Sequence, residues 1–441
     1  MKPRFLWISA GLLAFVALIA LIAGTQWFQS YLRGREFLAL ISNLTGSTFR
    51  SSATFEPLRW TGSSVYSEQA TLQGQPGSAV QTLEARQIRA EMNWRAILDG
   101  AWRIDEINIT RLQGHFQKPA PTTESASPPK SDRPASGLVA LLPKRFELGR
   151  ANIADAEISF GEARLTGTAL AITPDGSGWQ LIGSGGRLLV PHLPEFKILD
   201  FRAREQGGDI FLSESHLTLG DSGKVSASGT SADGGSLRVK WESIDPKSLM
   251  DAGWKRHLSG LLSGSAVIEA SGQIEGDMLL QDGRIEDLPV LGLIADFTGN
   301  PSFRRMPVQE MRGHFSYRMG VLKVEKFTME SKGLLRMVGS ATIGPGGALD
   351  GRFEVGVTPQ TLQWLPGSRE RVFRTARDGY LWTEMIVGGT LQNPTEDLSA
   401  RLTTALGQEL IEKGTDALQN LPGGAAEGVK SILDILRPLT R

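Results

Sequence analysis

Apolar and polar residues alternate along most of the chain between residues 146 and 398. The alternation is clearest in the segments LRVKW (237–241) and RFEVGV (352–357), where charged side chains separate the apolar ones. Successive side chains of a β-strand point to opposite faces, so this period of two residues predicts strands with one apolar and one polar face. Glycine punctuates these segments throughout, which indicates many turns and a mainly β fold.

Helices are predicted only near the two ends of the chain. Apolar residues at helical spacing between residues 29 and 46, with Gly46 at the stop position, predict a short amphipathic helix. The segment 93–100 resembles a single helical turn closed by glycine. After Asp397 the pattern becomes helical again, in 398–419 and 425–436.

A run of twenty residues without charge, FLWISAGLLAFVALIALIAG, extends from residue 5 to residue 24. At about 1.5 Å per residue it is long enough to cross a bilayer of roughly 30 Å, and aromatic residues flank it. The run is longer than the apolar region of a cleaved signal peptide and lacks a good cleavage site. We therefore expect a retained membrane anchor, with a short basic tail inside the cell and the rest of the chain in the periplasm.

The chain contains a divergent internal repeat. LTLGDSGKVSASGT (217–230) aligns with FTMESKGLLRMVGS (327–340), and the order of later matches is the same in both copies. We expect two copies of one strand-rich unit, at about 200–276 and 310–394. A strand module with one apolar face must bury that face. Two sheets that cover each other would do so, as would an elongated, curved sheet whose apolar side forms an open trough, and the alternation does not separate these alternatives.

Composition excludes several classes of function. The formal net charge is 0, so the chain has no excess of positive charge that would bind nucleic acid. The absence of cysteine excludes disulfide scaffolds, thiol catalysis and cysteine-ligated metal sites. The five histidines are scattered and form no zinc motif, and the glycine clusters lack the lysine of a phosphate-binding loop. We expect no catalytic residues, no metal and no cofactor, so the protein is not expected to be an enzyme.

Several of these features together resemble the AsmA-like family of Gram-negative envelope proteins. They are the N-terminal anchor, the helix that ends at Gly46, the turn before the long strand 103–116, and two C-terminal segments, GHFSYRMGVLKVEKFTMESKGLLRMVG (313–339) and MIVGGTLQNPTEDL (385–398). The resemblance covers most of residues 1–400. This chain is short for the family, and its closing helical segment is not part of the family's core pattern.

The resemblance implies an inner-membrane protein of the AsmA/TamB type, with a single transmembrane helix and a repeating β-groove in the periplasm. We expect an elongated, curved, antiparallel-rich groove that holds or passes phospholipid acyl chains and supports outer-membrane assembly. The alternative is an anchored β-scaffold, also without enzymatic activity, that binds other envelope proteins. The expected partners are membrane phospholipids and the inner membrane, with other envelope proteins as further candidates and no nucleic acid. The residues expected to line the groove are Leu237, Val239, Trp241, Phe353, Val355 and Val357.

These expectations divide the chain into consecutive segments. They are a cytoplasmic tail (1–4), a transmembrane anchor (5–28), an amphipathic helix (29–46), an N-terminal β-groove segment (47–117), a linker rich in proline and serine (118–136), a β-groove that includes the first copy of the repeat (137–309), the second copy, which is the AsmA-like C-terminal region (310–397), and a C-terminal helical segment (398–441).

Overall fold

The structure, a computed structural model, describes residues 30–97, 99–117, 145–250, 255–286, 291–292, 295, 301–362 and 367–413. The expected anchor at 5–28, the linker at 118–136 and the end of the C-terminal segment lie outside these residues. Within the residues that are described, no helix is both long and apolar enough to span a bilayer. The chain divides into two compact units, 1–208 and 209–441, each of which is built mainly from β-strands.

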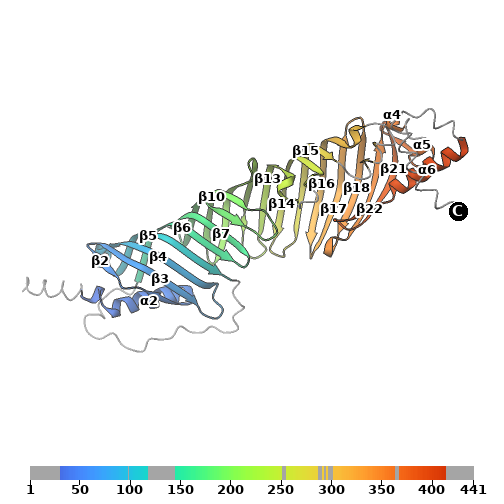
Figure 1. Cartoon of the computed structure of the whole chain (residues 1–441). Coiled ribbons are helices and arrows are strands. Elements are labelled where there is room, and N and C mark those ends of the chain that lie inside the picture. The colour runs from blue at the N-terminus through green and yellow to red at the C-terminus, as the bar shows by residue number, and fades with distance from the viewer. Residues whose placement is uncertain are drawn as a thin grey trace, which may run out of the picture. The chain divides into compact units, whose positions relative to one another are not determined.

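Unit 1 is a sheet with one helix against its first strands (Figure 1). Its elements are α2 (Arg35–Phe49), β1 (Ser51–Phe55), β2 (Arg59–Thr61), β3 (Ser64–Gly74), β4 (Val80–Asn93), the 3-10 turn η1 (Trp94–Ile97), β5 (Ala101–Phe116), β6 (Arg145–Phe160), β7 (Ala163–Asp175), β8 (Gly178–Ser184), β9 (Arg187–Leu189) and β10 (Phe196–Gln206). Each strand from β3 to β7 pairs with the next one in sequence. Strands β1 and β2 both pair with β3. Strands β8 and β9 each pair with β7 on one side and with β10 on the other.

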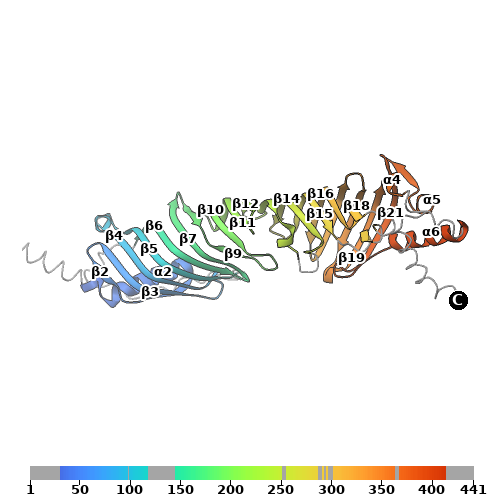
Figure 2. The ribbon, with the colours of Figure 1, turned by 45° about the horizontal axis from the view of Figure 1, so that its top comes forward.

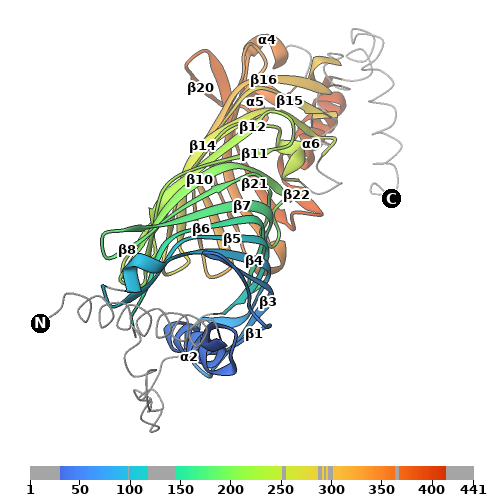
Figure 3. The same ribbon diagram turned by 90° about the vertical axis from the view of Figure 1, so that its left-hand side faces the viewer.

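The helix α2 packs on the sheet through aromatic side chains. Phe37 of α2 lies 5.1 Å from the ring of Trp102 and 5.8 Å from the ring of Trp60, measured between ring centroids. Trp102 is fully buried, and the ring of Phe146 stacks on it with 6.2 Å between the ring centroids. Figure 3 shows α2 beside β1 and β3, below the curved strands of unit 1. The amphipathic pattern of 29–46 therefore corresponds to a helix that seals one end of the apolar face of this sheet.

The pairing of β5 with β6 is parallel, whereas the other strand pairs within each unit are antiparallel in the part of the chain that the structure describes. The alternation of residues does not reveal this pairing, because a parallel and an antiparallel neighbour give the same period of two. Polar side chains cross-link the two strands on their polar face. Gln113 Nε2 donates a hydrogen bond of 2.9 Å to Glu157 Oε2, and Asn152 Nδ2 donates one of 2.6 Å to Glu106 Oε1.

The hydrogen bond from Gln113 lowers the pKa of Glu157, since it stabilises the charged carboxylate; partial burial opposes the effect and Arg111 adds to it. Because the pKa of Glu157 is lower in the folded than in the unfolded state, its carboxylate stabilises the fold at any pH above the ordinary carboxyl pKa. This stabilisation is lost as the pH falls through the pKa of the folded state. We expect Gln113→Met to reduce the free energy of unfolding more at pH 7 than at pH 3, as measured by urea titration. Gln180→Met, on the exposed face of β8, is the matched control and should show no pH dependence.

Unit 2 is an antiparallel meander (Figure 2). Its elements are β11 (Asp209–Leu219), β12 (Gly223–Thr230), β13 (Ser236–Ile244), η3 (Pro246–Ser248), β14 (Leu258–Glu269), β15 (Ile274–Glu286), η4 (Pro301–Phe303), β16 (Arg305–Arg318), β17 (Val321–Ser331), β18 (Leu335–Ile343), η5 (Pro345–Gly347), β19 (Leu349–Val357), α4 (Pro359–Leu362), α5 (Ser368–Arg371), β20 (Thr375–Arg377), β21 (Tyr380–Gly389), β22 (Pro394–Glu396) and α6 (Leu398–Lys413). Each strand from β11 to β19 pairs with the next one in sequence, and β21 then pairs with β19, β20 and β22.

The order of elements in unit 2 agrees with the predicted repeat. Three strands and a short helix precede a fourth strand in both copies: β11–β12–β13–η3–β14 in the first, and β17–β18–β19–α4–β21 in the second. The aligned glycines Gly229 and Gly339 each lie opposite an apolar residue of the following strand, Leu237 and Phe353 respectively, although the two pairs lie in different rows of the sheet. The second copy differs in having α5 and β20 inserted before its last strand.

Candidate functional site

The candidate site is the apolar face of the sheet in unit 2, and it begins with β13. Val239 lies directly opposite Ala227 of β12 and Ala266 of β14. Residues that are directly opposite in an antiparallel pair point to the same face of the sheet. The register therefore identifies which side chains of neighbouring strands share a face with Val239.

Four rows of paired residues cross the sheet on this face, and nearly all of their members are apolar or glycine. One row contains Trp241, Gly264, Met278 and Gly313, and Phe327, Gly339, Phe353 and Met385 continue it on the later strands. The middle row is Ala227, Val239, Ala266, Gly276, Phe315, Val324, Ala341, Gly351 and Val387. The row nearer the hairpin tips is Leu237, Ile268, Ile274, Tyr317, Leu322, Ile343 and Leu349. The row nearer the helices is Leu262, Leu280, Met311, Met329, Met337, Val355 and Thr383.

The opposite face of the same strands is polar. One row of paired residues on the polar face lies one residue along each strand from the row that begins at Leu237. It consists of Arg238, Val267, Glu275, Ser316, Lys323, Thr342 and Asp350. His314 lies on this polar face between two carboxylates, with Nδ1 3.0 Å from Asp277 and Nε2 3.2 Å from Glu275. Two surface pockets of unit 2 are lined mainly by polar-face residues, so neither of these two is the apolar face.

Exposure divides the apolar face into two parts. In the row nearer the helices, Leu280, Met329, Val355 and Thr383 are buried, and Leu262, Met311 and Met337 are half-buried. In the row nearer the tips, every side chain is half-exposed within the described part of the chain, and Tyr317 is 40% exposed. We call the two rows from Ala227 to Val387 and from Leu237 to Leu349, together with the adjoining half-buried rings of Trp241 and Phe353, the open apolar surface. Its small residues Ala266, Gly276 and Gly351 are buried between the neighbouring strands. A large apolar surface that is left partly exposed to water is a candidate binding surface.

Aromatic rings lie flat against this surface because glycines face them on neighbouring strands. A Cβ atom added to Gly264 would come within 2.5 Å of the Trp241 ring, and one added to Gly276 within 2.8 Å of the Phe315 ring. Phe353 lies over Gly339 in the same way, with 2.6 Å between the added Cβ and the ring. An aromatic ring over a cross-strand glycine covers exposed backbone. The rings therefore do not stand up from the sheet.

The structure separates the six predicted lining residues into two groups. Leu237, Val239, Trp241 and Phe353 are half-buried side chains on the apolar face, outside the helix-covered part. Val355 and Val357 are only 3% and 2% exposed, in a core cluster that includes Leu362 of α4 and Leu398 of α6. Val355 and Val357 are therefore corrected from lining residues to core residues, because the C-terminal helices cover this end of β19.

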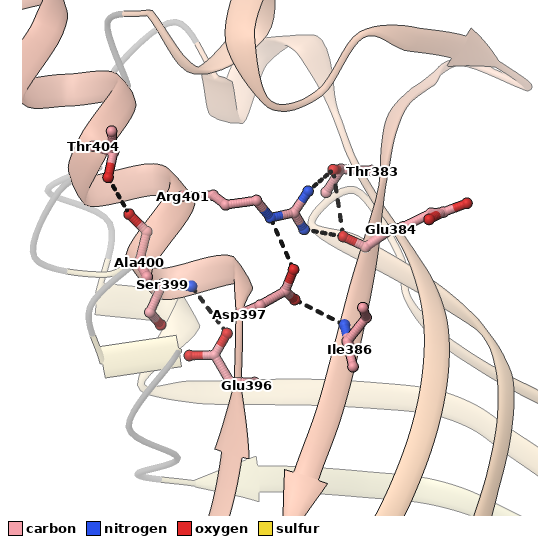
Figure 4. A network of polar contacts seen from close by, with 9 residues as sticks. All are labelled: Thr383, Glu384, Ile386, Glu396, Asp397, Ser399, Ala400, Arg401 and Thr404. Atoms are coloured by element: carbon pink, nitrogen blue, oxygen red, sulfur yellow. Dashed lines mark hydrogen bonds and ion pairs between the residues drawn. The ribbon is translucent and has the colours of Figure 1, made fainter.

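The position of α6 is fixed by polar contacts with β21 (Figure 4). Asp397 accepts a hydrogen bond of 2.8 Å from the backbone N–H of Ile386, and it forms an ion pair of 3.1 Å with Arg401. Arg401 also donates to Thr383 Oγ1 and to the backbone carbonyl of Glu384. These contacts hold the apolar side of α6, with Leu398 and Leu402, in the core cluster.

Sequence reasoning missed most of the open apolar surface. Ile274, Tyr317, Leu322 and Ile343 belong to it but were not among the predicted residues. Register shifts in β17 interrupt the strict alternation there, between Val324 and Phe327 for example, which weakens the signal in the sequence. The repeat could have identified Leu322 and Ile343, since both lie within its second copy.

Unit 1 has an apolar face of the same kind. One row of paired residues there is Ile88, Ile109, Ile153, Leu170, Gly183 and Phe201. Ile153 and Leu170 are buried in a cluster with Ile109 and Phe201, so this face is more completely packed than the open apolar surface of unit 2.

Among the residues that the structure describes, no cluster of three or more His, Asp or Glu side chains could hold a metal ion. Comparisons of the chain with protein-family models, curated proteins and solved structures found no match.

Proposed function

We propose that the protein is a lipid-handling protein without enzymatic activity, which holds phospholipid acyl chains on the open apolar surface of unit 2. In this proposal the chain is anchored in the inner membrane by residues 5–28, and both units lie in the periplasm of a Gram-negative cell. The lipids are passed passively, in support of outer-membrane assembly, and the sheet acts as the repeating β-groove of an AsmA-like protein.

The observation that carries the proposal is the half-exposed row from Leu237 to Leu349. This row crosses seven strands and has no charged residue. The adjacent row on the polar face, from Arg238 to Asp350, has four charged residues. Six spacings of about 4.8 Å give this row a width of roughly 29 Å. That width is close to the hydrocarbon thickness of a bilayer, about 30 Å, which contains two acyl chains end to end. The surface therefore has the dimensions and the polarity that acyl chains require.

The expected strength of binding is also suitable for transfer. Each methylene group removed from water contributes about 0.8 kcal/mol. A chain with ten methylenes, each losing about half of its contact with water, gains about 4 kcal/mol before the cost of association. Two such chains gain about 8 kcal/mol, which corresponds to a dissociation constant near 1 μM if that cost is ignored. The gain from two chains is twice the gain from one, so a diacyl lipid is held more tightly than a lipid with one chain.

Photo-crosslinking in cells tests the proposal. A photoreactive phenylalanine analogue is placed at Val239, on the apolar face, and in a separate variant at Lys240, the next residue along β13 and on the polar face. Phe353 and Arg352 form a second matched pair on β19. We expect lipid adducts at Val239 and Phe353 to exceed those at their partners by at least fivefold, as measured by mass spectrometry of the purified protein.

Equal yields of lipid at both members of each pair would contradict the proposal. Adducts with proteins rather than lipids at Val239 and Phe353 would favour the scaffold that binds other envelope proteins. The control positions are one residue away on the same strand, so differences in expression or in local backbone structure do not explain a difference in yield.

A further inference from the structure

Three hairpin tips lie next to one another at the end of unit 2 that is remote from α6. They are residues 318–320 between β16 and β17, 344–348 between β18 and β19, and 389–393 between β21 and β22. A Cβ atom added to Gly320 would lie 3.8 Å from Pro345, and one added to Gly347 would lie 3.8 Å from Leu391. The tips therefore form a continuous row, which we call the tip row.

Apolar side chains project from the tip row into solvent. Met319 is 88% exposed, the highest value of any large apolar residue in the described part of the chain, and Leu391 is 38% exposed. Pro345 is also exposed. Tyr317, the exposed member of the open apolar surface, is two residues before Met319 on the same hairpin.

Turn chemistry does not explain Met319. Its φ is 50°, in the left-handed region, and it is followed by Gly320 at 82°, so these two residues form a tight turn that favours Asn, Asp or Gly at the first position. The turn between β20 and β21 has the same backbone, with φ of 51° at Asp378 and 79° at Gly379, and it has the favoured type of residue. Met319 is thus neither the favoured turn residue nor part of the core.

The composition of the tip row suits an apolar environment that has negatively charged groups close by. Its three sequences, RMG, GPGGA and GTLQN, contain a single charged residue, Arg318, and no carboxylate. Several of its backbone groups are bonded within the row: Gly344 N–H to Ala348 O at 2.8 Å, Leu391 N–H to Gly347 O at 3.0 Å, and Asn393 N–H to Thr390 O at 3.0 Å. A backbone N–H or C=O group that is already hydrogen-bonded within the protein costs less free energy to transfer from water into a membrane.

We propose that the tip row is a membrane-contact site that enters the interfacial layer of a lipid bilayer. Met319 and Leu391 enter the boundary of the acyl chains, Tyr317 lies at the level of the head groups, and Arg318 pairs with lipid phosphate. Interfacial membrane segments combine these residue types: apolar and aromatic side chains to enter, and basic side chains for anionic head groups. The site goes beyond the proposed function, since holding acyl chains on the sheet does not require hairpin tips to touch a bilayer.

The absence of cysteine in the chain allows a direct test. A single cysteine is introduced as Met319→Cys or as Asp378→Cys, and is labelled with an environment-sensitive nitrobenzoxadiazole fluorophore. The full chain is reconstituted in nanodiscs, and separate vesicles of equal parts phosphatidylcholine and phosphatidylglycerol with brominated acyl chains are then added. We expect at least twofold quenching and a blue shift at position 319, and no change at position 378, which lies at the other end of the strands in a turn with the same backbone.

A second variant separates membrane contact from folding. Met319→Asn supplies a residue that the turn favours, so the midpoint of thermal unfolding should stay the same or rise. With the fluorophore on Leu391→Cys, Met319→Asn should nevertheless reduce the quenching by the added vesicles severalfold, and Arg318→Glu should do the same. Absent quenching at position 319, or quenching equal to that at position 378, would overturn the membrane-contact site.

The two proposals fail separately. Lipid adducts at Val239 without quenching at position 319 would leave the open apolar surface as a lipid site and remove the tip row. Quenching at position 319 without adducts at Val239 would leave a membrane-contact site on a protein that does not carry acyl chains on its sheet.

Discussion

Val239→Asp should reduce the phospholipid that copurifies with the protein by at least tenfold. Val239 lies in the middle of the open apolar surface, opposite Ala227 and Ala266. A carboxylate at this position must lose water when an acyl chain lies over it, and an unpaired charge transferred to an apolar environment costs several kcal/mol. A factor of ten requires only about 1.4 kcal/mol, so the expected loss exceeds that threshold. The measurement is quantitative mass spectrometry of lipid extracted from the purified protein.

Lys240→Asp is the matched control, because the same residue is introduced one position away on the polar face of β13. It should leave the amount of bound lipid within about twofold of the wild-type level, since its carboxylate stays in water. Val239→Thr keeps the shape of the side chain and its preference for strands, and should have an intermediate effect. Comparable lipid in Val239→Asp and Lys240→Asp would show that acyl chains do not lie on this face.

Trp102→Ala should destabilise unit 1 by about 3–5 kcal/mol, the usual cost of removing a large aromatic side chain from a core. Trp102 is 0% exposed, and its ring packs against Phe37 of α2 and Phe146 of β6. Its removal therefore takes away part of the contact between α2 and the sheet. Urea unfolding, followed by the circular dichroism of the strands, measures the loss.

Phe160→Ala provides the comparison for that measurement. Phe160 is 56% exposed at the end of β6, and its removal should cost less than about 1 kcal/mol. If Trp102→Ala also cost less than about 1 kcal/mol, α2 would not be docked on the sheet in solution. Such a result would leave the open apolar surface and the tip row unaffected, since both consist of residues of unit 2.

The sequence predicted which faces of the strands are apolar but not which parts of those faces are accessible. Leu237, Val239 and Trp241 alternate with two charged residues, and their shared face follows from the period of the strand alone. The same reasoning placed Val355 and Val357 with Phe353, and their orientation was predicted correctly. Their burial was not, because it depends on the packing of α4 and α6, which come from later parts of the chain.

The two copies of the repeat were predictable because their glycines mark places that only glycine fits. Gly229 and Gly339 each face a large apolar residue on the next strand, and a Cβ atom at either position would come within 2.3 Å of a backbone oxygen. The parallel pairing of β5 with β6 was not predictable in this way. Its cross-links, such as Gln113 with Glu157, join residues 44 positions apart, and nothing in the local pattern relates them.

By itself, the amino-acid sequence determined that the chain forms strands with one apolar face, arranged partly as a repeat. Local properties decide these features: the period of two, the positions of glycine, and the types of residue present. Only the tertiary structure decided that the apolar rows line up across the strands of unit 2, that helices cover one end of them, and that Met319, Pro345 and Leu391 meet in one row of tips. Register and helix packing are contacts between distant segments, and they depend on how complete side chains fit together.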